Sequence, residues 1–166
     1  MRARVCIVAG LVIALALVGV EVLRKERLLA SGDVVLLELA PVDPRSLVQG
    51  DYMRLDYALS RGVDAHADWP RDGALVVQTD GRGVARFVRR DDGQPLATGE
   101  HRLTYRRRRS QVRVGTDAFY FQEGTAGEYA PARFGELRVA PDGTSVLVGL
   151  RDADLKPLGQ LGSPSR

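Results

Sequence analysis

The chain has 166 residues, of which 45% are hydrophobic and 27% charged, and its formal net charge is +3. A single cysteine, Cys6, excludes an intramolecular disulfide bond. The two histidines, His66 and His101, lie far apart in the sequence, which excludes the closely spaced ligands of a zinc site. We therefore expect neither a metal ion nor another cofactor.

A long apolar segment follows a short flank of residues 1–4. No charged residue interrupts Val5 to Val20, and two further apolar residues follow Glu21. A helix needs about 20 apolar residues to cross a bilayer. We predict that residues 5–23 form a transmembrane anchor.

Two further features of the apolar segment concern whether it is cleaved and how it is oriented in the membrane. Neither Val18-Gly19-Val20 nor Leu28-Leu29-Ala30 offers the small residues of a cleavage site, so we interpret the segment as an uncleaved signal-anchor rather than a signal peptide. Positive charges on its two sides are equal in number, which leaves its orientation open. We expect residues 24–32 to continue the helix as a linker, with Gly32 as its stop.

Residues 33–151 are predicted to form one β-rich domain. Apolar and polar residues alternate in short segments, as in half-buried strands, and turn signals such as Asp80-Gly81 and Pro141-Asp142-Gly143 separate them. We predict a mainly β fold, a meander of antiparallel hairpins forming a sandwich or a partly open barrel, with residues 152–166 as a surface or disordered tail. The predicted strands cover residues 35–39, 52–59, 74–79, 83–90, 102–108, 112–121, 134–139 and 144–150.

Two short helical turns are expected within this domain. Asp43 is a suitable N-cap before Pro44, and Gly50 is a suitable left-handed stop. Thr125 and Glu128 have the spacing of a capping box, which predicts a second turn. Both turns are too short to be stable without packing against the sheet.

The segment Gly50-Asp51-Tyr52-Met53-Arg54-Leu55-Asp56-Tyr57 resembles, at every fixed position, the motif that names the GDYXXLXY protein family. The resemblance continues at Ala40-Pro41-Val42-Asp43-Pro44-Arg45, Phe121-Gln122-Glu123-Gly124 and Phe134-Gly135-Glu136-Leu137-Arg138-Val139. It implies a bacterial membrane-anchored protein without an assigned reaction. It also implies a domain on the periplasmic side of the inner membrane and a polytopic membrane protein as partner.

The motif divides by face when it is treated as a strand. Met53, Leu55 and Tyr57 alternate with their neighbours and are predicted to face the core. The other side chains could contact a partner or ligand, although ion pairs that hold the preceding loop are an alternative role for the charged ones. This candidate surface consists of Asp43, Arg45, Asp51, Tyr52, Arg54 and Asp56.

Glu123 completes the candidate surface, because it follows the aromatic segment Phe119-Tyr120-Phe121. A carboxylate against aromatic rings could act as an acid, but general acid–base work needs a partner that the sequence does not identify. A structural, hydrogen-bonding glutamate is the alternative. No serine lies in a nucleophile elbow, and we predict that the protein is not an enzyme.

The largest charge feature is the run Arg106, Arg107, Arg108 and Arg109. Strand geometry places Arg107, Arg109 and Arg113 on one side and Arg106 and Arg108 on the other, as at a hairpin tip. A solvated tip is one interpretation, and contact with anionic lipid headgroups or an acidic partner is another. We expect no nucleic acid as a partner outside the cytoplasm.

These features predict a membrane-anchored extracytoplasmic protein that acts as a non-enzymatic envelope component and binds a polytopic inner-membrane partner. A carboxylate-dependent hydrolase using Glu123 and a motif aspartate is one alternative. A periplasmic sensor of a small ligand is the other, and it would require a closed apolar cavity with a few polar groups.

Overall fold

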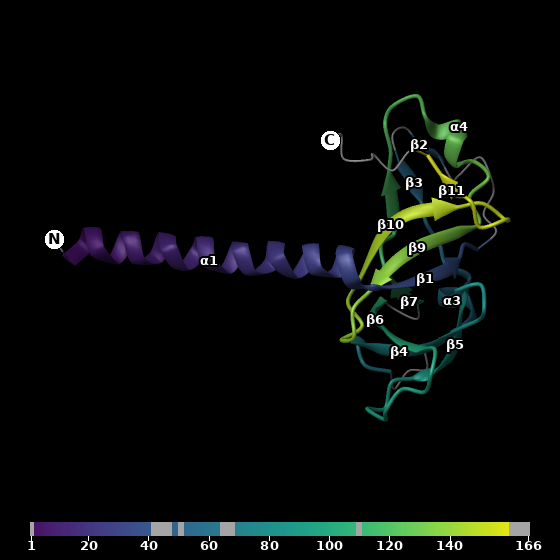
Figure 1. Cartoon of the computed structure of the whole chain (residues 1–166), viewed down its shortest axis with the longest axis horizontal. Helices are drawn as coiled ribbons and strands as arrows, with labels where there is room; N and C mark the ends of the chain where they lie inside the picture. Colours follow the sequence, from purple (N-terminus) through teal and green to yellow (C-terminus); the bar gives the residue numbers. More distant parts are fainter. Residues whose placement is uncertain (1, 41–47, 50–51, 64–68, 109–110, 160–166) are drawn as a thin grey trace.

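A computed structural model describes residues 2–40, 48–49, 52–63, 69–108 and 111–159. One long helix, α1 (Arg2–Ser31), extends away from a domain built mainly of β-strands (Figure 1). Within the described part of the chain, no helix has both the length and the apolarity that a membrane crossing requires.

Helix α1 continues without a break from the apolar segment to the start of the β domain. It ends where the N–H of Gly32 donates to the carbonyl of Leu28 at 2.9 Å. A Cβ at Gly32 would lie 2.5 Å from that carbonyl oxygen, so a glycine is required at this close turn. Near the middle of the helix, Glu21 pairs with Arg24 at 3.0 Å.

The strands of the domain form three sheets, in the orders β1-β9-β10-β11, β5-β4-β6-β7 and β2-β3-β8. Their pairings are antiparallel. The strands are β1 (Asp33–Glu38), β2 (Val48–Gln49), β3 (Tyr52–Arg54), β4 (Asp72–Thr79), β5 (Ala85–Arg90), β6 (Glu100–Arg108), β7 (Gln111–Val114), β8 (Ala118–Tyr120), β9 (Phe134–Val139), β10 (Ser145–Arg151) and β11 (Pro157–Leu158). Two short helices, α3 (Ala58–Gly62) and α4 (Ala126–Tyr129), complete the described elements.

One core joins the sheets. Strand β1 connects them, because Leu36 bridges to Val84 before β5 and Leu39 bridges to Tyr57 after β3. The prediction of a mainly β, antiparallel fold is confirmed, and the sheets have the form of half-barrels. The fully buried side chains at their centre are Val35, Leu37, Leu75, Val77, Leu103, Leu137, Met53, Val112, Val114, Val139 and Leu150.

Local turn chemistry explains the hairpins. Between β4 and β5 the carboxylate of Asp80 accepts hydrogen bonds from the backbone N–H groups of Val84 and Arg82, at 3.0 and 2.8 Å, and these bonds lower the pKa of Asp80. Between β9 and β10 the carboxylate of Asp142 accepts from the N–H of Thr144 at 2.8 Å. Asp-Gly turns of this kind are where sequence patterns are most informative.

Several strand ends are shifted from the prediction by one or two residues, and two predicted strands differ by more than that. The predicted strand 112–121 is two strands, β7 and β8, because Gly115 has a φ of +63° and turns the chain. The motif strand stops at Arg54, and Leu59 lies on α3. Leu59 packs against the core from α3, and its apolar character therefore extended the strand-like alternation of the motif to residue 59.

Three further predictions are corrected. Val48 and Gln49, expected in a helical turn, form β2 and pair with β3; the remainder of the turn around Asp43 lies outside the described residues. Helix α4 forms as expected, but the Thr125 hydroxyl donates to the Gln122 carbonyl at 2.7 Å instead of capping the helix. Alternation within the predicted strand 35–39, with Val35, Leu37 and Leu39 facing the core, places Leu36 on the polar face, but Leu36 is buried where β1 bonds to the β4–β5 turn.

The segment predicted as a tail contributes a strand. Pro157 and Leu158 form β11, which pairs with the end of β10. The turn between them depends on Asp152, whose carboxylate accepts from the N–H groups of Asp154 and Lys156 at 2.9 and 2.8 Å. The sheet β1-β9-β10-β11 therefore includes residues up to 158.

Candidate binding surface

The motif keeps its predicted alternation in the structure. Met53, Leu55 and Tyr57 are buried, Tyr52 is half-buried and Arg54 is exposed. The inward side chains join the core, and the outward ones are available for contact. The division of the motif by face is confirmed for these residues.

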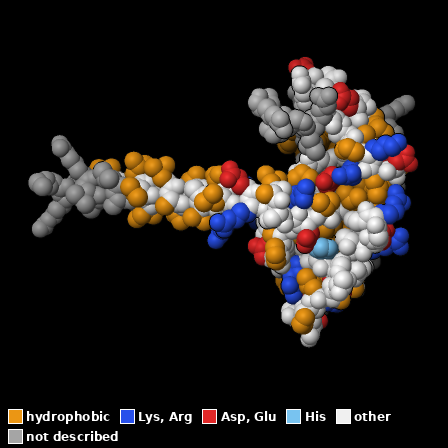
Figure 2. Space-filling model, viewed as in Figure 1, with side chains coloured by type: hydrophobic (Ala, Val, Ile, Leu, Met, Phe, Trp, Pro, Cys, Tyr) orange, Lys and Arg blue, Asp and Glu red, His pale blue; other side chains and the backbone are white. Residues whose placement is uncertain are grey.

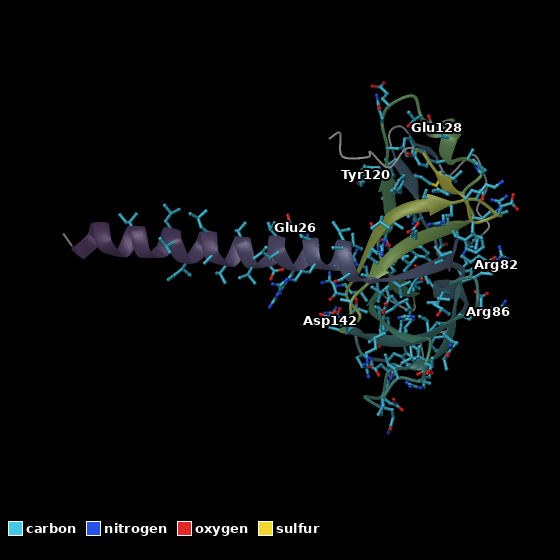
Figure 3. The ribbon with its side chains drawn as sticks, in the orientation of Figure 1. Glu26, Arg82, Arg86, Tyr120, Glu128 and Asp142 are labelled. Carbon is cyan, nitrogen blue, oxygen red and sulfur yellow. The ribbon has the colours of Figure 1, made fainter. Side chains whose placement is uncertain are left out.

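Strand β8 lies beside the motif strand and adds an aromatic residue to its outer face. Tyr52 is directly opposite Tyr120, and their ring centroids are 5.7 Å apart. Tyr120 is 75% exposed and projects on the side of the domain from which α1 extends (Figure 3). The sequence did not indicate this pairing, because the two tyrosines are separated by α3 and by the four strands of another sheet, β4 to β7.

Arg54 is the cation of this face. It lies opposite the small Ala118 of β8, and within the described residues its guanidinium has no ion-pair partner. We call the set Tyr52, Arg54 and Tyr120 the tyrosine surface. It combines two aromatic rings with one accessible positive charge.

The carboxylates of the predicted surface are arranged differently. Asp56 is held by Arg61 of α3, whose Nη2 and Nε lie 2.7 and 2.9 Å from Oδ2. The sequence did not reveal this partner, because the pairing depends on the helix that replaces the end of the predicted strand. Asp56 therefore has a structural role in joining β3 to α3.

Glu123 is exposed in the turn between β8 and α4. The aromatic rings before it pack elsewhere: Phe119 and Phe121 each contact Tyr129, with ring centroids 5.1 Å apart in both pairs. The arrangement that an acid against aromatic rings would need is not formed. The remaining predicted residues, Asp43, Arg45 and Asp51, lie outside the described part of the chain.

Tyr57, the last residue of the motif, is buried with a hydroxyl that finds no hydrogen-bond partner within the described structure. Its ring lies over two glycines, and a Cβ at Gly135 would approach it to 3.1 Å. Burial, and secondarily the Asp117 carboxylate, raise the pKa of Tyr57 above its ordinary value. Sequence analysis placed this side chain in the core but could not reveal its unpaired hydroxyl.

The raised pKa of Tyr57 predicts a dependence of stability on alkaline pH. The folded state holds the phenol proton to a higher pH than the unfolded chain, in which tyrosine has a pKa of about 10. Its contribution to stability is therefore complete below that pH and is lost as the pH rises through the folded-state value. We expect the free energy of unfolding to fall more steeply above about pH 10 in the wild type than in Tyr57→Phe, measured by urea unfolding. Equal slopes would contradict the assignment.

Other polar groups of the described residues serve the fold. His101 contacts the Asp33 carboxylate at 3.3 Å, which ties β6 to the start of β1. No group of three histidine, cysteine, aspartate or glutamate side chains that could hold a metal ion occurs in the described ranges. Of the sequence-predicted candidates that the structure describes, Tyr52 and Arg54 remain suited to binding, and both lie on the tyrosine surface.

Comparison with known proteins gives one result. No curated protein and no solved structure matches the chain significantly. The sequence model of the GDYXXLXY protein family matches residues 14–150, from within α1 to the end of β10, and includes the motif strand and its partner β8. The chain belongs to the GDYXXLXY protein family.

Proposed function

We propose that this protein is a membrane-anchored binding component, whose domain docks onto the exposed part of a polytopic inner-membrane protein through the tyrosine surface. The observation that carries the proposal is the exposed Tyr120 ring against Tyr52, beside the accessible guanidinium of Arg54. Tyrosine and arginine are the residue types that most often dominate the energy of protein interfaces. The proposed site thus contains an aromatic anchor and a charge that can select a partner.

The proposed anchor is α1. Large apolar side chains such as Leu11, Val12, Ile13 and Leu15 are each more than half exposed, and their positions in sequence place them on every side of the helix. Figure 2 shows hydrophobic side chains along α1, with charged ones nearer the domain. A helix that is apolar all round requires an apolar environment on all sides. Lipid and the helices of a polytopic partner both supply one.

The geometry also bears on where the partner lies. Tyr120 projects on the same side of the domain as α1 (Figure 3). A helix anchored in the inner membrane would therefore turn the tyrosine surface toward that membrane, with the domain in the periplasm. A periplasmic loop of a polytopic protein, carrying an acidic residue for Arg54 and an apolar contact for Tyr120, is the partner that fits this arrangement.

The alternatives have less support. A carboxylate-dependent hydrolase would use Glu123 with a motif aspartate, but Asp56 is occupied by Arg61 and Glu123 is exposed in a different turn. A small-ligand sensor requires an apolar cavity, whereas the pocket at the end of β6 is lined by charged residues such as Arg107.

The proposal is tested by co-purification of the full chain from its own membranes in mild detergent. We expect Tyr120→Ala and Arg54→Ala each to lower recovery of a polytopic partner by at least about tenfold, because truncating an interface anchor costs more than ~1.4 kcal/mol. Arg86→Ala is the matched control, since Arg86 is exposed on the side of the domain away from α1 (Figure 3).

Circular dichroism of each variant establishes that the domain is folded. A partner recovered equally well with Tyr120→Ala, Arg54→Ala and Arg86→Ala would show that the tyrosine surface is not the interface. Loss with Arg86→Ala alone would move the interface to the other side of the domain.

A further inference from the structure

A second, separate region of the domain concentrates positive charge. At the end of β6 an open pocket is lined by four arginines and one aspartate. We call it the arginine pocket; its lining residues are Arg71, Asp72, Arg106, Arg107 and Arg108. It lies on the sheet β5-β4-β6-β7, and so does not involve the tyrosine surface.

The charges of the arginine pocket are not balanced from within. Asp72, its one carboxylate, is 3.5 Å from the Nε of Arg106, and both side chains are largely exposed. No ion pair involves Arg71, Arg107 or Arg108 within the described residues. Like charges held together without counter-charges repel one another, and a bound anion would relieve this repulsion.

Arg107 supplies the second observation. It shares the face of β6 that buries Leu103 and Tyr105, while its cross-strand neighbour is the buried Val112. Its backbone N–H donates to the carbonyl of Arg71 at 2.6 Å, which fixes the strand at the pocket. Its side-chain Nε is buried and has no hydrogen-bond acceptor in the described structure. A buried donor without an acceptor is rare in folded proteins and costs about 1–3 kcal/mol.

The hairpin register corrects one sequence prediction about this cluster. Arg113 is directly opposite Arg106, so it lies on the face of Arg106 and not on that of Arg107. Its guanidinium pairs with Asp117. Arg113 is therefore already neutralised and takes no part in the pocket.

We propose that the arginine pocket binds a phosphate-type oxyanion. Guanidinium groups present paired N–H donors that match the oxygens of phosphate, and such charge-assisted hydrogen bonds are stronger than neutral ones. The anion supplies the negative charge that Asp72 alone does not provide, and it gives the Arg107 side chain, whose Nε has no acceptor among the described residues where it is buried, a partner toward which it can turn. Arg71, the residue before β4, and Arg108, the last residue of β6, contribute further donors.

A phosphate group could come from solution or from a lipid headgroup, and the position of the pocket bears on this. His101, near the start of β6, contacts Asp33 just after α1. Arg107 is six residues further along the strand, about 20 Å away at the rise of an extended chain. The pocket is therefore not beside the end of α1, and this separation favours a soluble phosphate group.

The chain contains one tryptophan, which serves as a reporter. Trp69 lies two residues before Arg71, with its ring centroid 5.6 Å from that of Tyr105 and under the guanidinium of Arg90 at 5.9 Å. The experiment titrates the full chain in detergent with inorganic phosphate and follows Trp69 fluorescence against sodium chloride of equal ionic strength. We expect saturable binding that Arg107→Gln and Arg108→Gln each weaken by at least about tenfold. Arg86→Gln, on an exposed arginine outside the pocket, is the control and should leave binding unchanged.

A second arm tests lipid as the source. The same chain is reconstituted in vesicles with and without phosphatidylglycerol, in the absence of phosphate. A Trp69 response only to phosphatidylglycerol that Arg107→Gln removes would support the oxyanion site with a headgroup as its occupant. Arg108 is exposed, so Arg108→Gln tests the pocket even if Arg107→Gln disturbs the fold. The proposal is overturned by no saturable response in either arm, or by responses that both variants retain.

Discussion

Tyr57→Ala is expected to lower the free energy of unfolding by about 3–5 kcal/mol, the range for removing a buried aromatic side chain. Tyr57 is 3% exposed, and its backbone bridges to Leu39, so it joins the motif segment to β1. Its ring lies against Gly115 and Gly135, and a Cβ added at Gly135 would come within 3.1 Å of it. Urea unfolding followed by circular dichroism measures the change.

Tyr57→Phe is the matched control. It keeps the ring and removes only a hydroxyl that has no hydrogen-bond partner in the described structure. Removing an unpaired buried hydroxyl is close to neutral or stabilising, so we expect a change within about 1 kcal/mol. If Tyr57→Phe lowered the free energy of unfolding as much as Tyr57→Ala does, the hydroxyl would have a hydrogen-bond partner, and the stability would come from the hydroxyl and not from the ring.

The sequence could predict the features of the fold that depend on local patterns, but not those that depend on contacts between distant segments. Alternation placed Met53, Leu55 and Tyr57 correctly, because the side-chain period of a strand is a local property. Hairpins with turns such as Asp80-Gly81 were predicted for the same reason. Pairings between distant segments, β1 with β9 and β3 with β8, were not, because nothing local specifies them.

The candidate site shows the same limit. Tyr52 and Arg54 were predicted from the motif, but Tyr120 reaches the same surface only through the β3–β8 pairing. The pairing of Arg61 with Asp56 depends on α3, which lies where the sequence predicted the end of a strand. The unpaired Nε of Arg107 depends on packing that no sequence pattern displays.

Breaking the ion pair between Glu136 and Arg151 is expected to have the second large effect on stability. Glu136 is 7% exposed on β9, and its carboxylate accepts from the Nε of Arg151 at 2.7 Å. Arg151 also donates to the carbonyl of Leu155 at 2.7 Å, in the turn before β11. Removing one partner of a fully buried pair costs about 3–5 kcal/mol, because the other charge stays buried and unpaired. Since Arg151 is partly exposed, we expect Arg151→Leu to cost about 2–3 kcal/mol in urea unfolding.

A double-mutant cycle distinguishes the pair from its surroundings. Glu136→Leu with Arg151→Leu removes both charges and leaves no buried carboxylate without a partner. The double variant should therefore lose less stability than the sum of the single variants, by about 1–2 kcal/mol. Additive single effects would instead show that the two side chains act independently and that the cost of Arg151→Leu comes from its bond to Leu155. Because Arg151 links β9 to the turn before β11, the cycle measures how strongly residues beyond β10 are part of the folded domain.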